Sequence, residues 1–150
     1  MNIVEQVELS THVHATEDEA KVVKALLNLL PTQMRSNAYL IAEDNMGHFG
    51  NRIRILKLIF KGEDSLNVLK HILTQLNPLD REILMLSLSE RFNEGRLYLR
   101  FNKQLAYRGI LRLDDSDDVI KAVVRINHWV LKRSGIETII RDLMSEKPRA

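Results

Sequence analysis

Alternating hydrophobic and polar residues predict that several stretches of this chain form β-strands with one buried face. The pattern covers residues 3–14 and 119–126, and a short strand is expected at residues 38–42. Residues 52–60 are equally rich in Ile and Leu, but their alternation slips. A β-bulge near Lys57, or burial on both faces, would explain the slip.

Residues 96–101 show the sharpest alternation. Arg96, Tyr98 and Arg100 share one face, so this face carries two guanidinium groups on either side of an aromatic ring. Cations bind phosphates and the ring offers a stacking surface to an unpaired base, so this face favours RNA. A solvated basic strand face is the alternative explanation. The other face is hydrophobic and suited to a core: Leu97, Leu99 and Phe101.

Hydrophobic residues at helical spacing predict a first helix through residues 22–30. We expect Thr16 to begin this helix, because Thr16 and Glu19 have the spacing of a capping box. Pro31 should end it.

The same spacing predicts a helix over residues 66–76 and another in the tail, over 136–143. Asn77, followed by Pro78, predicts the start of a further helix that runs to about Ser89. Three connecting segments complete the pattern: a turn at 43–51, a strand at 110–113 and an acidic turn at 114–118.

The order of these elements, roughly β-α-β-β-α-α-β-β-β-α, predicts an α+β fold. We expect a mostly antiparallel sheet with helices packed on one face, which leaves the other face free for a partner. The length fits a single domain over residues 1–150, with 134–150 as a C-terminal helix and tail.

Composition narrows the class of protein. The chain is 45% hydrophobic and 28% charged, which is ordinary for a globular protein, and it has no cysteine, which excludes disulfides and thiolate chemistry. No apolar run approaches the roughly 18–20 residues that cross a bilayer, and the N-terminus lacks the apolar core of a signal peptide. We therefore expect a cytoplasmic protein with no membrane partner. The net charge is only +2, yet residues 91–112 contain six basic residues and one acid, Glu94.

Three segments contain side chains of the types used in catalysis or metal binding. His12 and His14 have His-x-His spacing, but no third or fourth ligand is evident. The carboxylates of residues 114–118 lack the ligand spacing of a calcium loop, so a solvated turn is favoured. His48 lies in a glycine-bearing turn with no nucleophile beside it. We expect no cofactor, no metal and no enzymatic activity.

Three motifs, at residues 14–18, 47–51 and 97–104, resemble the archaeal family of small predicted RNA-binding proteins that are often described as exosome-associated. The resemblance runs in order over residues 7–126. It implies a fold similar to the ribosomal protein that binds 5S rRNA, a homodimer, and exosome- or ribosome-related protein partners. Asp is expected where this chain has Asn102, so one charge is missing there.

We therefore predict a non-catalytic protein that binds structured or ribosomal-type RNA. One alternative is a metal-dependent nuclease that uses the 114–118 carboxylates, and another is a dimeric protein–protein adaptor that uses the 136–144 helix or the open sheet face. The predicted RNA contacts are Arg52, Arg54, Arg96, Arg100, Lys103 and Arg108 with phosphates, Tyr98 or Tyr107 as stacking surfaces, Gln104 at base edges, and His48 as a further contact.

Overall fold

A computed structural model describes residues 2–46, 50 and 52–145 of the chain. Within these residues the body is a six-stranded antiparallel sheet with the strand order β2-β3-β1-β6-β5-β4. The strands are β1 (Val4–Val13), β2 (Ile41–Met46), β3 (Arg52–Lys61), β4 (Phe92–Asn93), β5 (Arg96–Asn102) and β6 (Val119–Ile126).

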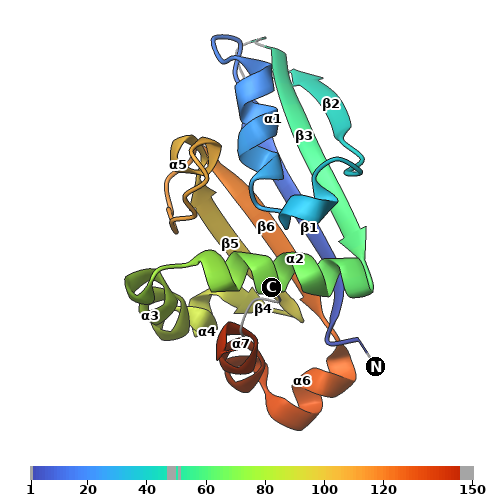
Figure 1. Cartoon of the computed structure of the whole chain (residues 1–150), viewed down its shortest axis with the longest axis vertical. Coiled ribbons are helices and arrows are strands. Elements are labelled where there is room, and N and C mark those ends of the chain that lie inside the picture. The colour runs from blue at the N-terminus through green and yellow to red at the C-terminus, as the bar shows by residue number, and fades with distance from the viewer. Residues whose placement is uncertain (1, 47–49, 51, 146–150) are drawn as a thin grey trace.

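Helices cover one face of this sheet and leave the opposite face uncovered, which confirms the predicted α+β arrangement (Figure 1). The helices are α1 (Glu19–Leu27), α2 (Glu63–Gln75), α3 (Pro78–Leu86), α4 (Leu88–Arg91), α5 (Lys103–Tyr107), α6 (His128–Ser134) and α7 (Ile136–Ser145), with a short 3-10 turn at Thr32–Met34. None of these described helices is long and apolar enough to span a bilayer.

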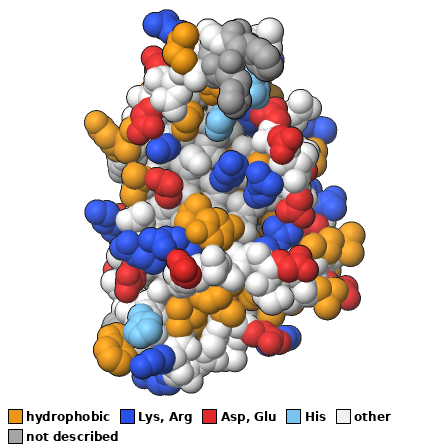
Figure 2. Space-filling view, turned by 180° about the vertical axis from the view of Figure 1, so that it is seen from behind, with side chains coloured by type: hydrophobic (Ala, Val, Ile, Leu, Met, Phe, Trp, Pro, Cys, Tyr) orange, Lys and Arg blue, Asp and Glu red, His pale blue; other side chains and the backbone are white. Residues whose placement is uncertain are grey.

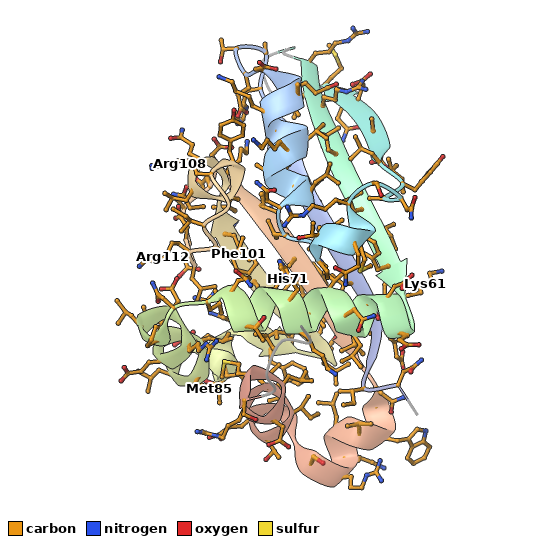
Figure 3. All side chains as sticks on the ribbon, in the orientation of Figure 1. Lys61, His71, Met85, Phe101, Arg108 and Arg112 are labelled. Atoms are coloured by element: carbon orange, nitrogen blue, oxygen red, sulfur yellow. The ribbon has the colours of Figure 1, made fainter. Side chains whose placement is uncertain are left out.

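The core lies between the sheet and the helices, and the strand alternation determines which side chains enter it. Leu97, Leu99 and Phe101 of β5 are buried, as predicted. Figure 3 shows Phe101 pointing into the layer between the sheet and α2. Each buried hydrophobic side chain of this size contributes roughly 1.5–3 kcal/mol, so the core is the main source of stability.

Strand β3 has no bulge. Its pairing with β1 runs without a register shift from Lys61 to Arg54. Leu56 and Leu58 are buried in the core, whereas Ile59 lies on the other face and is 39% exposed. The alternation slips in the sequence because isoleucines also occupy the uncovered face, where Ile53 and Ile55 are half-buried. Of the two explanations offered, the bulge near Lys57 is therefore wrong.

Two strand predictions need correction. Strand β2 begins at Ile41, not at residue 38, and continues to Met46 through residues that were expected to form a turn. Most of its side chains are exposed because β2 is an edge strand, so its pairing with β3 left no hydrophobic pattern. The rest of that expected turn, residues 47–49 and 51, lies outside the described residues.

Residues 110–113 are not a regular strand. They lie along the edge of β5 through one isolated bridge, between Phe101 and Leu113. Two backbone hydrogen bonds flank this bridge, from the Asn102 N–H to the Arg112 carbonyl and from the Asp114 N–H to the Arg100 carbonyl, both at 3.0 Å. The backbone N–H of Leu113 donates to the buried carboxylate of Asp80, at 2.9 Å. This contact fixes the segment against α3, which the sequence pattern did not reveal.

Helix α1 begins later than predicted. Its N-cap is Asp18, whose side chain accepts from the backbone N–H of Ala20 at 3.0 Å. Thr16 lies in the preceding turn and is exposed. The carboxylate of Glu17 accepts from the backbone N–H of His14 at 3.0 Å, which steadies that turn rather than the helix.

We expect Asp18→Ala to lower the free energy of unfolding by about 1 kcal/mol, because it removes the acceptor at the helix N-terminus. Thr16→Ala should change it by no more than about 0.5 kcal/mol, since it removes no cap. Urea titrations of the two variants measure the difference. Equal losses, or a larger loss for the Thr16 variant, would contradict the assignment of the cap.

Candidate nucleic-acid interface

The uncovered sheet face carries side chains in three rows that cross β3, β1, β6 and β5. The rows arise because residues paired in register lie side by side and every second residue points to the same face. The middle one, called the central row, is mostly apolar with a single acid, and it consists of Ile59, Glu8, Val123 and Tyr98.

A basic row lies on each side of the central row, two residues away along every strand, which corresponds to about 7 Å. The Arg100 row consists of Lys57, Ser10, Lys121 and Arg100. The Arg96 row consists of Lys61, Gln6, Arg125 and Arg96. Figure 2 shows this face, with hydrophobic side chains in the middle and basic side chains around them.

Like charges face each other across the β5–β6 pair. Arg96 is paired in register with Arg125, and Arg100 is paired with Lys121. Directly opposed like charges destabilise a sheet. Glu5 offsets one of them, through an ion pair with Arg125 at 3.2 Å. In the part of the chain that the structure describes, Arg96 and Lys121 form no ion pair. A bound polyanion would relieve this repulsion.

The titration of His12 reports the same positive field. His12 lies on β1, near one end of the open face. Burial lowers the pKa of its imidazole, and the positive charges of Lys121, His14 and Lys103 lower the pKa further, against a smaller opposing effect of a carboxylate. The imidazole is therefore neutral near pH 7, and neighbouring cations dominate its surroundings.

Tyr98 lies on this face beside a hollow and is 44% exposed. The hollow measures about 360 Å³, and Arg91, Arg100 and Lys121 also line it. The guanidinium of Arg91 is held by the Asp115 carboxylate at 3.2 Å. An exposed phenol ring among cations is an arrangement that accepts an unpaired base together with its phosphate.

The other predicted aromatic contact lies elsewhere. Gln104, Tyr107 and Arg108 belong to α5 and its end, and with α1 they line a second hollow of about 350 Å³. Lys21 and Lys24 of α1 stand over the Tyr107 ring, at 5.9 and 5.0 Å from its centroid. Figure 3 shows Arg108 at the outer edge of the molecule, beside α5. The two predicted stacking rings, Tyr98 and Tyr107, therefore lie at separate places on the molecule.

The two predicted arginines of β3 do not join the basic rows. Arg54 forms ion pairs with Asp44, at 3.2 Å, and with Glu19 at the start of α1. Arg52 is exposed at the beginning of the strand. His48 lies outside the described residues.

Lys103 is buried, with 4% of its surface exposed. Its ammonium contacts the Asp118 carboxylate at 2.6 Å, the Glu17 carboxylate at 3.1 Å and the backbone carbonyl of His12 at 2.8 Å. His14 completes this cluster, with its Nε2 at 3.2 Å from Asp118. These contacts occupy the Lys103 ammonium and leave little of it for a phosphate.

The same cluster contains the one metal-like donor set found among the described residues: His14, Glu17 and Asp118. The donors do not fit a metal, because the Lys103 ammonium already contacts both carboxylates and its positive charge repels a second cation there. Burial of Asp118 opposes its ionisation, but the hydrogen bond and charge of Lys103, with those of His14, outweigh it and lower the pKa of the Asp118 carboxyl. The cluster is an internal ion-pair network.

The acidic turn has few free carboxylates. Asp114 accepts from the backbone N–H of Ser116 at 2.9 Å and from the Asn102 amide at 3.0 Å. Asp115 and Asp118 are paired with Arg91 and Lys103, as described above. These contacts give the carboxylates of the turn a structural role, and none of them favours a nuclease site.

Asn102, where Asp was expected, has two structural roles. Its side-chain oxygen caps α5 by accepting from the Leu105 N–H at 2.8 Å, and its amide donates to Asp114. An aspartate could provide the cap but not the second hydrogen bond, and it would face another carboxylate.

The alternation in β6 is visible in the sequence, but the sequence pattern alone does not show that β3 and β6 add basic side chains to the same face as Arg96 and Arg100. Recognising them required the strand order, because only the order places β6 next to β5. The four residues are Lys57, Lys61, Lys121 and Arg125.

Comparisons with known proteins identify the family of this chain. A family model described as RNA binding matches residues 6–126. An uncharacterised protein of Methanocaldococcus jannaschii is 36% identical over 97% of this chain and 98% of its own length. A protein of Pyrococcus abyssi that is named an RNA-binding protein is 28% identical over 91% of this chain and 90% of its own length.

The fold is shared as well. The crystal structure of a Sulfolobus solfataricus protein is 32% identical and superimposes with a TM-score of 0.75, over 93% of this chain and 96% of that chain. The matched family model spans five of the six described strands completely and the sixth, β1, from Gln6 onward, and it includes both strands that carry the opposed arginines. The chain therefore belongs to the RNA-binding family that this model describes.

Proposed function

We propose that this protein binds RNA on its open sheet face and does so without catalysis. The phosphates contact the two basic rows, and a base stacks on Tyr98. One observation carries the proposal. The sheet face that the described helices leave uncovered has a basic row on each side of the mostly apolar central row, which includes Tyr98. Phosphate contacts supply most of the affinity, and stacking on an aromatic ring depends little on which base of the RNA is bound.

The predicted contacts divide between this face and other places. Arg96, Tyr98 and Arg100 form the primary contact in this proposal. Gln104, Tyr107 and Arg108 form a second contact, with Arg52 and His48 as outlying ones. Lys103 positions the start of α5, and Arg54 joins β3 to α1, through the ion pairs described above.

The resemblance to proteins described as exosome-associated supports a role in RNA processing, with exosome- or ribosome-related protein partners. It also supports a homodimer as the assembled form. Neither point is needed for the sheet face to bind RNA.

The proposal is tested by the salt dependence of binding. A protein that neutralises about four to six phosphates should show a slope of roughly −3 to −5 when log affinity is plotted against log salt concentration. Filter binding to a labelled RNA hairpin measures the slope, and the recovered hairpin should be intact after incubation with magnesium. A slope near zero would refute phosphate contacts, and cleavage that EDTA abolishes would refute a non-catalytic role.

A further inference from the structure

The single tryptophan of the chain is exposed where the open face ends. Trp129 lies in the first turn of α6, directly after β6, and is 62% exposed. Its backbone is held in place, because the side-chain oxygen of Asn127 accepts from the N–H groups of Trp129 and Val130 at 2.9 and 3.1 Å. The backbone N–H of Asn127 donates in turn to the carbonyl of Ile3 at 2.8 Å. The ring is thus presented to solvent on a fixed support.

Positive and aromatic groups surround this ring. The ammonium of Lys132 lies 5.7 Å from the ring centroid, and Arg133 follows in the same short helix. The imidazole of His128 meets the indole edge to face, at 5.6 Å between centroids. A solvent-exposed indole of this size is unusual, because burying it would stabilise the fold. Cations beside an aromatic ring are the combination that binds unpaired nucleotides.

A hollow of about 570 Å³ lies where the Arg96 row meets α6. Arg125, the last basic residue of β6, and His128, the neighbour of Trp129, line it together with Glu5 and Glu94, and Glu5 is paired with Arg125. Phe92 and Leu131 provide apolar lining there. This volume is in the range of small-molecule sites. Figure 2 shows histidine, basic and hydrophobic side chains together at the lower end of the open face.

The spacing along β6 relates the two exposed rings. Val123 is paired with Tyr98, and Asn127 lies four residues further along the chain, which is about 13 Å of extended backbone. A bound chain that passes Tyr98, crosses the Arg96 row and runs parallel to β6 therefore reaches α6 after a few nucleotides. Stacking on a protein ring requires a free base face, which the interior of a duplex does not offer.

We propose that the RNA-binding surface continues from the open sheet face onto α6, and that Trp129 stacks an unpaired nucleotide of the bound RNA. The proposal rests on the proposed function, and it names the ligand class as RNA with a single-stranded segment. Trp129 lies beyond residues 6–126, the part of the chain matched by the family model. The proposed nucleotide contact therefore lies in a segment that the family match does not cover.

Because Trp129 is the only tryptophan, its fluorescence reports this contact directly. Titration of the full-length protein with a 12-nucleotide oligouridine should quench the emission, and a blunt 12-base-pair RNA duplex should quench it much less. Trp129→Ala should weaken oligouridine binding, measured by anisotropy of a labelled oligonucleotide, about 5- to 100-fold. Trp129→Phe should restore most of the affinity, since it keeps a ring.

Tyr39→Ala is the matched control, because it removes another exposed aromatic side chain, 82% exposed, from the segment just before the edge strand β2. It should leave the affinity within about twofold. The parent protein could bind oligouridine in a salt-dependent way without any quenching of the tryptophan emission, and the Trp129→Ala variant could bind it equally well. That result would overturn the inference and leave the proposed function standing. If the parent binds neither oligouridine nor the hairpin, both are overturned. If Trp129→Ala leaves RNA affinity unchanged and instead dissociates a dimer in sedimentation, Trp129 belongs to a protein interface, and the inference is likewise overturned.

Discussion

Replacing Arg96 and Arg100 together by alanine should weaken hairpin RNA binding roughly 30-fold or more at moderate salt and should reduce the salt slope by about two. The two guanidinium groups lie in different basic rows, so each should contact its own phosphate. Two charge-assisted hydrogen bonds, at about 1–1.5 kcal/mol each, account for the loss. Each phosphate contact contributes about one to the slope. Filter binding across a salt series measures both quantities.

The fold should survive this change, because both side chains lie on the open face and removal of opposed like charges relieves repulsion. The matched control is Lys24→Ala with Arg108→Ala, which removes the same charge from the α1–α5 side. We expect a smaller loss of affinity there. A larger loss in this second pair would move the main RNA contact from the sheet face to the helical side.

Replacing Lys103 by methionine should lower the free energy of unfolding by about 2–3 kcal/mol, while RNA affinity changes by no more than about threefold. Methionine keeps the length of the side chain but removes the three hydrogen bonds of the ammonium to Asp118, Glu17 and the His12 carbonyl. Urea denaturation and filter binding provide the two measurements. If Lys103→Met loses much of its RNA affinity but keeps its stability, Lys103 contacts RNA directly.

The same cluster predicts a pH dependence. The folded protein lowers the pKa of Asp118, so the unfolded chain binds more protons than the folded one between the lowered and the ordinary value. The stability that this carboxylate contributes is therefore present at neutral pH and is lost as the pH falls below about 4. Lys103→Met should reduce this acid sensitivity. An unchanged acid profile would show that Lys103 does not hold the pKa of Asp118 down.

Local patterns were sufficient wherever one face of an element enters the core. The alternation in β5 and β6 and the helical spacing in α2 and α7 led to the right elements, because burial of a regular stripe is the strongest signal that a sequence carries. The cap at Asn77 was also found, since its acceptor serves the N–H of Asp80 three residues away.

The errors arose where distant residues decide the local structure. The 110–113 segment has strand-like residues, but it pairs with β5 through a single bridge, and its Leu113 N–H donates to the distant Asp80. Strand β2 pairs through its main chain with little help from its side chains. The short helices α5 and α6 begin at Asn102 and Asn127, and they are too brief for a hydrophobic period to appear.

The sequence by itself determined the α+β class, the buried residues of the central strands and the basic face of residues 96–101. Only the tertiary structure decided which cations gather beside Tyr98, because strand order and register, and not position in the chain, place Lys121 and Arg125 opposite Arg100 and Arg96. It also decided that Lys103 turns inward. A lysine beyond the end of a strand has the same sequence signature whether it meets solvent or two carboxylates, and the partners here lie 86 and 15 residues away.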